Sequence, residues 1–286
     1  MNELSLDLVE ILVNIRNQIL TITEEEWPEL GNLIDSVLPN PLNPMALLPI
    51  ATGRAVGGNV RDLIPIASAV ILFDLSLRIV DDCADQDDSG AIYHAIGIGR
   101  AVNYAMALNT IATRELWRVA LPADRLSKLL TAYFHSFLQV CRGQDDDLSK
   151  RVTTLDSYQE VVRLKTIAAY EFAAAIGAHV GTADSDAIST CSVCGVHLGW
   201  MAQILNDIEA LWFPKLENHP EIKKMTFPVL LGLSIDHPNA KEIENLYRIQ
   251  AFDRAHMCAL LDEMDVRTRL MNLALDHRDR AIKSLA

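Results

Sequence analysis

The sequence lacks the features that mark small secreted proteins and nucleic-acid-binding proteins. Its 286 residues include only five cysteines, too few and too scattered for the disulfide framework of a small secreted domain. Positive charge is also scarce, because 25 Lys and Arg face 38 Asp and Glu and leave a formal net charge of −13. A chain this acidic is not expected to bind a nucleic-acid backbone. If it binds phosphates, metal ions must bridge them.

Basic targeting signals and long uninterrupted apolar runs are missing as well. The stretch MNELSLDLVE at the start has neither the basic region nor the cleavage signal of a secretory peptide. The longest apolar run, Leu63–Leu75, is broken by Pro65 and Asp74, so it predicts no transmembrane segment. We therefore expect a reduced, cytoplasmic protein.

Alternating strand patterns are scarce, whereas apolar residues recur with helical spacing along the whole chain. Breakers such as Pro39–Pro44 and Asp87–Gly90 fall where helices have to end. No shift in composition marks a linker. The sequence therefore predicts an all-α protein whose residues 1–286 form one domain, with about nine to eleven helices.

The stretch IVDDCADQDDSG, residues 79–90, crowds aspartates at the end of an apolar helical run. Asp81 and Asp85 share a helix face, with Asp82 one step around it. These like charges repel one another, and they also oppose the helix macrodipole. One interpretation is a solvated acidic helix end. The other is a Mg²⁺ site, since carboxylate oxygens are ligands that Mg²⁺ prefers.

Further polar groups lie inside apolar helical stretches downstream. Gln203, Asn206 and Asp207 belong to the run GWMAQILNDIEAL, and polar groups in such a setting need partners. Lys165 lies on the apolar face of another predicted helix. Its ammonium group either reaches out to solvent or binds an anion in the interior.

Five motifs in this order resemble those of the trans-isoprenyl diphosphate synthases and their class I terpene synthase relatives. The likeness covers about residues 40 to 235, and five ordered motifs are far more specific than one. They are DDxxD at Asp81–Asp85, GQxxDL at Gly143–Leu148, YxxxxxxKT at Tyr158–Thr166, the approach to a second acidic motif at Gln203–Asp207, and K-x-T-x-P at Lys224–Pro228.

The resemblance implies an isoprenoid-synthase helical bundle with a central apolar cavity, acting as a homodimer. It implies that a cluster of about three Mg²⁺ ions binds an allylic prenyl diphosphate, whose diphosphate leaves to form a carbocation. The implied metal ligands are Asp81, Asp82, Asp85, Asn206, Asp207 and Glu209. The implied diphosphate contacts are Lys165 and Lys224, and Arg100, outside the family motifs, is a further candidate. Gln144 and Gln203 would face the metals or the cation, and Phe73, Ser76 and Phe172 would line the cavity.

The sequence departs from the family at three places. The RRG segment that follows the first acidic motif in the family is missing, and Arg100 is the candidate for one of the lost charges. Chain-elongating members bind isopentenyl diphosphate through a basic GKxxRP segment, whereas no Lys or Arg occurs from Leu38 to Gly53 here. The second acidic motif is degenerate, because it begins with Asn206 and has Ala210 in place of its last aspartate.

Three functional hypotheses remain open. A class I terpene synthase, a carbon–oxygen lyase, would let the cation cyclise or lose a proton, and it needs no isopentenyl site. A prenyltransferase would elongate the chain or transfer it to another acceptor, and members that prenylate a peptide tryptophan have a similarly short, acidic region after the first motif. The third hypothesis is a non-catalytic partner subunit, which the intact DDxxD disfavours. We expect the first.

Overall fold

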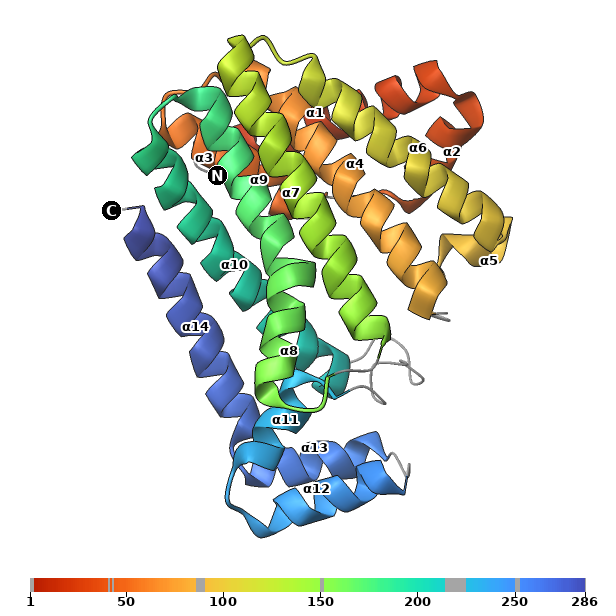
Figure 1. The fold of residues 1–286 in the computed structure, drawn as a ribbon, viewed down its shortest axis with the longest axis vertical. Helices are drawn as coiled ribbons and strands as arrows, with labels where there is room; N and C mark the ends of the chain where they lie inside the picture. The colour runs from red at the N-terminus through yellow and green to blue at the C-terminus, as the bar shows by residue number, and fades with distance from the viewer. Residues whose placement is uncertain are drawn as a thin grey trace. The chain divides into compact units, whose positions relative to one another are not determined.

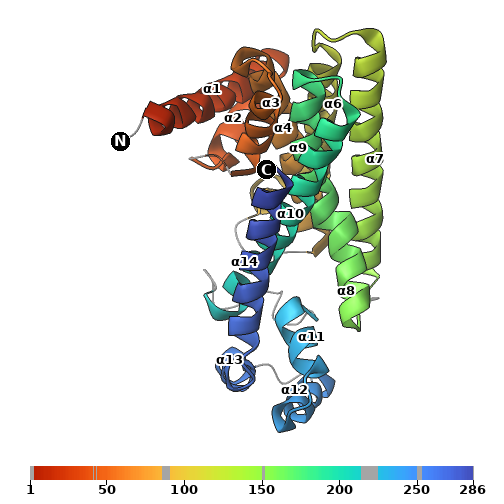
Figure 2. The same cartoon turned by 90° about the vertical axis from the view of Figure 1, so that its left-hand side faces the viewer.

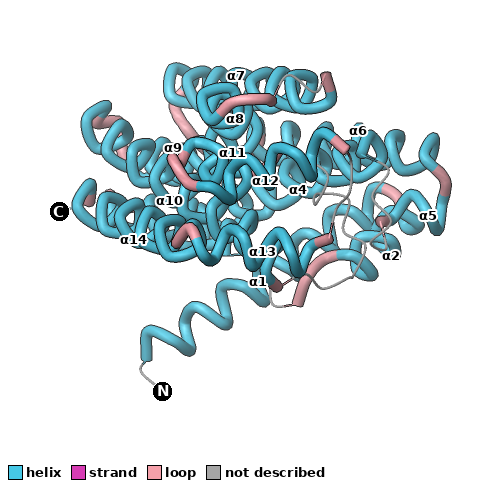
Figure 3. Tube along the Cα trace, turned by 90° about the horizontal axis from the view of Figure 1, so that it is seen from below, coloured by secondary structure: helices cyan, strands magenta, loops and turns pink. Residues whose placement is uncertain are grey.

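Helices account for every regular element in the part of the chain that the structure describes. The structure, a computed structural model, describes residues 3–40, 42, 44–85, 91–149, 152–213, 225–249 and 253–285. Across these residues the trace contains helices and loops but no strand (Figure 3). The all-α prediction is confirmed. The predicted Lys224 and the end of the acidic run, residues 86–90, lie outside the described residues.

The described residues contain more helices than the sequence predicts, because breaks occur at places without an obvious breaker cluster. Fourteen α-helices and two short helices of other types are present in these ranges. Pro28 begins a new helix directly after Trp27. Gly97 separates two further helices with a φ of 82°, a backbone conformation that glycine adopts without strain.

Contacts divide the chain into two units, of which the first comprises residues 1–86, 90–137 and 169–195. Its helices are α1 (Glu3–Glu26), α2 (Pro28–Val37), η1 (Pro44–Leu47), α3 (Leu48–Ala55), α4 (Val60–Asp85), α5 (Ile92–Ile96) and α6 (Ile98–Trp117), with the first parts of α7 (Ala123–Leu148) and α10 (Ser185–Trp212) and nearly all of α9 (Ala168–Gly181).

Helix α4 is the centre of this first unit. It is apolar on most of its surface, and its buried residues include Leu63, Val70, Phe73 and Ile79, as expected of a helix surrounded by others. Helices α1, α3 and α6 pack against it, and α4 and α6 run side by side in Figure 1. The acidic motif Asp81–Asp85 is therefore the last turn of a buried helix.

Two helices are long and apolar enough to cross a membrane when only length and composition are considered. They are α4, with a mean hydropathy of 2.0 in its most apolar window, and α10, with 1.3. The sequence predicts no transmembrane segment because Pro65 and Asp74 interrupt the apolar run, whereas the helix continues through both residues without a break. Burial accounts for the composition of α4, since 67% of that window is covered by the protein itself.

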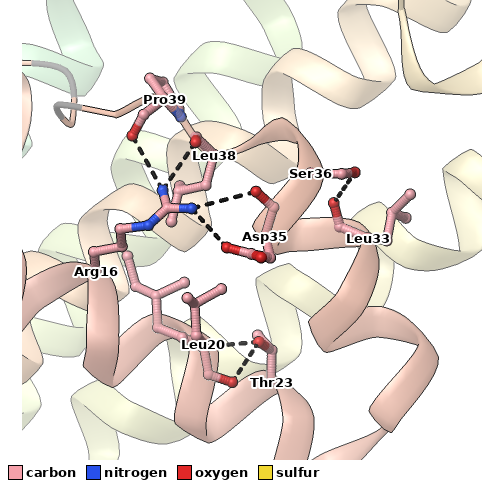
Figure 4. Close-up of polar contacts among 9 residues, drawn as sticks. Arg16, Leu20, Thr23, Leu33, Asp35, Ser36, Leu38 and Pro39 are labelled. Carbon is pink, nitrogen blue, oxygen red and sulfur yellow. Dashed lines mark hydrogen bonds and ion pairs between the residues drawn. The ribbon is translucent and has the colours of Figure 1, made fainter.

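The chain between α2 and α3 is anchored by Arg16, which lies on α1. α1 and α2 lie against each other (Figure 2). The Arg16 guanidinium donates to the backbone carbonyls of Leu38 at 2.9 Å and Pro39 at 3.2 Å, and to Asp35 Oδ1 at 2.7 Å (Figure 4). An arginine that binds the last carbonyls of a helix satisfies groups that the helix itself leaves open. The Arg16 guanidinium is thus hydrogen-bonded to the end of α2.

The second unit comprises residues 87–89, 138–168 and 196–286. It contains the later parts of α7 and α10, together with α8 (Leu155–Val162), the π-helical turn η2 (Arg163–Ile167), α11 (Phe227–Ser234), α12 (Pro238–Arg248), α13 (Arg254–Glu263) and α14 (Val266–Ser284). Its apolar core joins α8, α10 and α11 to α13 and α14 through residues such as Ile204, Phe227 and Leu261.

Candidate active site

The first acidic motif presents its carboxylates on the half-buried part of the last turn of α4. Asp81, Asp82 and Asp85 are each partly exposed, while Cys83 between them is 9% exposed and faces the core. Among the described residues, no three His, Cys, Asp or Glu side chains are grouped so that they would hold a metal by themselves. Carboxylates at this position still suit Mg²⁺, which binds few protein ligands and completes its shell with water and substrate phosphate.

Two further charged residues continue the same face of α4. Asp74, Arg78, Asp81 and Asp85 follow one another at helical spacing. The Arg78 guanidinium lies 3.8 Å from the Asp74 carboxylate, and burial raises the pKa of Asp74 above its ordinary value. Burial and the neighbouring Asp74 also raise the pKa of the Tyr170 hydroxyl. In the sequence alone, Asp74 is only an interruption of an apolar run.

The predicted cavity residues Phe73 and Phe172 come together in an aromatic cluster of the first unit. Their rings pack edge-on with centroids 5.7 Å apart, and Tyr133 packs against both, at 5.3 Å and 5.7 Å. Burial raises the pKa of Tyr133 to about 12. The Ser76 hydroxyl, 3% exposed, donates to the carbonyl of Phe73 at 2.7 Å. This part of the protein excludes water, and its lining of a cavity stays a prediction.

Arg100, a predicted diphosphate contact, lies on α6 and is engaged with a neighbouring aromatic residue. Its guanidinium donates to the Tyr104 hydroxyl at 2.8 Å and stands 5.5 Å from the centroid of the same ring. Tyr104 in turn packs edge-on against Trp27 at 4.7 Å. A role for Arg100 in diphosphate binding stays a prediction.

In the second unit, the GQxxDL and KT motifs form one assembly. Lys165 Nζ lies 3.0 Å from Asp147 Oδ2, and the two side chains are only 24% and 19% exposed. Lys165 belongs to the π-helical turn η2, a helix type that appears often at functional sites. A Cβ on Gly143 would lie 2.6 Å from the backbone nitrogen of Lys165, so the bare glycine allows α7 and η2 to approach this closely.

Gln144 stands out because its polar atoms have no hydrogen-bond partner among the described residues. Both Nε2 and Oε1 are buried, and neither is bonded to another group in that part of the chain. Gln144 precedes Asp147 by three residues on α7, so the two side chains share a face of that helix. The resemblance implies a polar role for Gln144, but nothing in the sequence indicates that its amide is unsatisfied.

Asp207, a predicted metal ligand, lies at the centre of a buried hydrogen-bond network. It is 4% exposed. Its Oδ2 accepts hydrogen bonds from the Tyr158 hydroxyl at 2.5 Å and from the Phe227 backbone N–H at 3.0 Å. Its Oδ1 accepts from Gln203 Nε2 at 2.8 Å, and Gln203 Oε1 accepts from the Thr166 hydroxyl at 2.7 Å. This placement favours a structural role for Asp207.

Asn206 and Glu209, the other predicted ligands of the second motif, are exposed on α10. They are three residues apart and share a face. A cavity of about 10 Å³ borders Asp207 on the inner side, which is space for no more than one water molecule. This space is therefore too small to be the predicted prenyl cavity.

The chain was compared with known proteins. The model of the polyprenyl synthetase family matches residues 45–264. A geranylgeranyl diphosphate synthase of Mycobacterium tuberculosis (strain ATCC 25618 / H37Rv) is 29% identical over 224 residues, which are 72% of this chain and 62% of that protein. A tryptophan prenyltransferase, ComQ, of Bacillus subtilis subsp. natto is 26% identical over 174 residues, or 61% of this chain and 53% of that protein. The matches thus span less than two thirds of these relatives.

Solved structures show the same fold. A geranylgeranyl pyrophosphate synthetase from Pyrococcus horikoshii Ot3 has a TM-score of 0.84 at 22% identity, covering 99% of this chain and 93% of that one. A polyprenyl synthase from Caulobacter crescentus CB15, complexed with calcium and isoprenyl diphosphate, has a TM-score of 0.82 at 18% identity, covering 96% and 88%.

These findings change the balance between the hypotheses. The curated relatives described above carry the names of prenyltransferases, so the comparisons favour the prenyltransferase hypothesis and do not support the preference for a terpene synthase and lyase. That preference rests on the missing isopentenyl site. The lack of this site excludes one acceptor, but it does not separate a transferase from a lyase. Since the family model covers well over half of its length, this chain belongs to the polyprenyl synthetase family.

Proposed function

We propose that the protein is a Mg²⁺-dependent prenyltransferase that takes its prenyl group from an allylic diphosphate between geranyl and geranylgeranyl diphosphate in length. The observation that carries the proposal is the intact DDxxD motif at the end of the buried helix α4, whose carboxylates are partly exposed while the helix behind them is apolar. A purely structural subunit would gain nothing from charges that repel one another there.

The proposed chemistry assigns a task to each group. Asp81 and Asp85, with Asp82 in support, would hold Mg²⁺, which would neutralise the diphosphate as its bond to C1 breaks. Lys165 and, by resemblance, Lys224 would contact the diphosphate oxygens, and Arg100 would replace a charge of the missing RRG segment. The diphosphate leaves with the electron pair of the C1–O bond, the acceptor supplies the electrons of the new bond to C1, and the proton lost by the acceptor passes to the released diphosphate. Surroundings that exclude water protect the cation from water.

We propose further that the acceptor is not isopentenyl diphosphate. A second diphosphate needs cations, and the segment from Leu38 to Gly53 has none. The nearby Arg16 donates hydrogen bonds to the Leu38 carbonyl and to Asp35. Because its guanidinium is already bound, it supports the view that no cation is available there. One relative is named as a tryptophan prenyltransferase, so an uncharged aromatic acceptor is the first choice. Chain elongation is the second candidate, because another relative is named as a geranylgeranyl diphosphate synthase.

We also propose that the enzyme works in the cytoplasm as a homodimer. Large apolar side chains on α6 support pairing, since Met106 and Trp117 are each 66% exposed, and an exposed apolar surface is typical of an interaction site. Sedimentation of the purified protein tests the pairing, and a monomer at micromolar concentration would contradict it.

The test of the activity is a substrate panel. The purified protein is incubated with Mg²⁺ and labelled geranyl, farnesyl or geranylgeranyl diphosphate, with water alone, with isopentenyl diphosphate, or with N-acetyl-L-tryptophanamide. We expect release of pyrophosphate and a prenylated indole. A longer prenyl diphosphate would support elongation, a cyclic or linear hydrocarbon formed without an acceptor would restore the lyase hypothesis, and no release under any condition would refute catalysis.

A further inference from the structure

The buried amide of Gln144 is an unsatisfied hydrogen-bonding group with both a donor and an acceptor. Four side-chain polar atoms in the described part of the chain are buried without a partner, and two of them are the Nε2 and Oε1 of this one residue. The other two belong to Arg125 and Arg254, whose remaining guanidinium nitrogens offer further donors. Gln144 therefore differs from both arginines, because neither function of its amide is used.

Burying an amide in this way is costly. The cost is about 1–3 kcal/mol on the scale of protein mutations when a buried polar group has no hydrogen bond. A leucine or methionine at this position of α7 would fill a similar space without that cost. The amide therefore needs a partner in the working protein, and the partner is either a buried water molecule or a bound substrate.

The surroundings of Gln144 favour a substrate. Its neighbour Gly143 lies against the backbone of Lys165, and Asp147, one helical turn further, binds the Lys165 ammonium group at 3.0 Å. Gln144 is thus next to Lys165, the residue that would contact the diphosphate in the proposed function.

The chemistry of the amide selects the kind of substrate. A prenyl chain has no polar atom to offer it. A diphosphate offers acceptors alone, so the Gln144 carbonyl would stay unpaired. A group that carries an N–H donor next to a C=O acceptor satisfies both functions at once, as one amide pairs with another.

We propose that Gln144 binds the acceptor substrate, and that this acceptor is an uncharged molecule presenting an amide, as a peptide does. This inference rests on the proposed prenyl transfer and adds the class of the acceptor and the residue that recognises it. It agrees with the lack of cations between Leu38 and Gly53, because an amide acceptor needs none.

The experiment compares wild-type protein with Gln144→Leu and with Gln159→Leu, a matched change at an exposed position of α8. Four quantities are measured: the midpoint of thermal unfolding, the KM for N-acetyl-L-tryptophanamide with farnesyl diphosphate, the KM for farnesyl diphosphate itself, and Mg²⁺-dependent pyrophosphate release without an acceptor. For Gln144→Leu we expect the KM for the acceptor to rise at least about tenfold, which corresponds to the loss of one hydrogen bond. The KM for farnesyl diphosphate stays within about twofold, and the unfolding midpoint rises, because an unsatisfied amide has been removed. Gln159→Leu changes none of these.

The possible failures are distinguishable. A lower unfolding midpoint with an unchanged acceptor KM would mean that Gln144 binds a structural water, and the inference would be wrong. Pyrophosphate release by the wild type, without prenylation of the tryptophan amide or competition by it, would also refute the inference and leave prenyl transfer intact. If the wild type releases no pyrophosphate from any prenyl diphosphate, the proposed function itself fails, and the inference fails with it.

Discussion

At the residue scale, the polar side chains inside apolar helices have different tasks although they look alike in the sequence. Asp207 and Asn206 are neighbours in the second acidic motif, yet Asp207 is buried and accepts hydrogen bonds from Tyr158, Phe227 and Gln203. Asn206 is exposed. A metal ion needs ligands that a substrate can reach, so Asn206 is the better candidate of the two.

We expect Asp207→Ala to destabilise the protein by about 3 kcal/mol or more, because it leaves several buried donors unsatisfied. Urea denaturation measures this change. Asn206→Ala, the adjacent control, keeps wild-type stability and weakens activation by Mg²⁺. If Asp207→Ala unfolds at the wild-type urea concentration and only its Mg²⁺ requirement changes, Asp207 is a metal ligand after all.

Asp81→Asn should lower pyrophosphate release by about a hundredfold or more, because one carboxylate of the proposed metal site is lost. The thermal unfolding midpoint should stay at its wild-type value, since Asp81 is partly exposed. Asp62→Asn, an exposed change in the first turn of the same helix, serves as the control and should keep full activity. Full activity in Asp81→Asn would show that the proposed metal assignment is wrong.

Asp74 predicts a pH dependence of stability. Burial raises its pKa, with Arg78 opposing that effect, and Tyr170 is the other titratable group that senses it. A carboxyl group with a raised pKa in the folded state binds its proton more tightly there than in the unfolded chain. Its contribution to stability is therefore greatest at acid pH and is lost as the pH rises from the ordinary carboxyl pKa through the raised one.

Asp74→Asn should remove that contribution. The free energy of unfolding of the variant should exceed that of the wild type at pH 7, and the difference should shrink as the pH falls toward the ordinary carboxyl range. Denaturation at a series of pH values measures both. A constant difference across the whole range would mean that Asp74 does not titrate as its burial implies.

At the scale of elements, residues from Tyr158 to Ile176 follow helical spacing in the sequence. The structure interrupts it with the π-helical turn η2, which contains Lys165. Periodicity alone does not reveal such a turn, because one inserted residue shifts the apolar pattern only slightly. In the folded protein, η2 packs closely against Gly143 of α7.

Gly143→Ala tests this contact. The new methyl group would lie 2.6 Å from the backbone nitrogen of Lys165, so α7 and η2 would have to separate. We expect a loss of about 1–3 kcal/mol in stability and weaker binding of prenyl diphosphate. Gly99→Ala on α6, where a Cβ would meet nothing within 4 Å, should gain up to about 1 kcal/mol from helix propensity. Equal effects of the two changes on the urea midpoint would contradict the proposed contact.

At the scale of the whole molecule, binding of metal and diphosphate should stabilise the folded chain. With Mg²⁺ and inorganic pyrophosphate at about a hundred times their dissociation constant, we expect about 2.7 kcal/mol of added stability. Chelation of Mg²⁺ should remove the effect, because an acidic protein does not bind an anion well without a bridging cation. Scanning calorimetry measures the shift, and stabilisation by pyrophosphate in the absence of Mg²⁺ would refute the metal-bridged site.

The sequence by itself determined that the chain is helical, where its main motifs lie, and which family it resembles. These properties depend on local spacing, since apolar residues at helical intervals and carboxylates one turn apart are visible in a single chain. Only the tertiary structure decided which polar groups are satisfied. Asp207 and Gln144 are both polar residues of long helices, yet Asp207 has partners on two other helices and on its own, whereas the Gln144 amide has none among the described residues. Hydrogen bonding across elements depends on packing, and packing is not a local property.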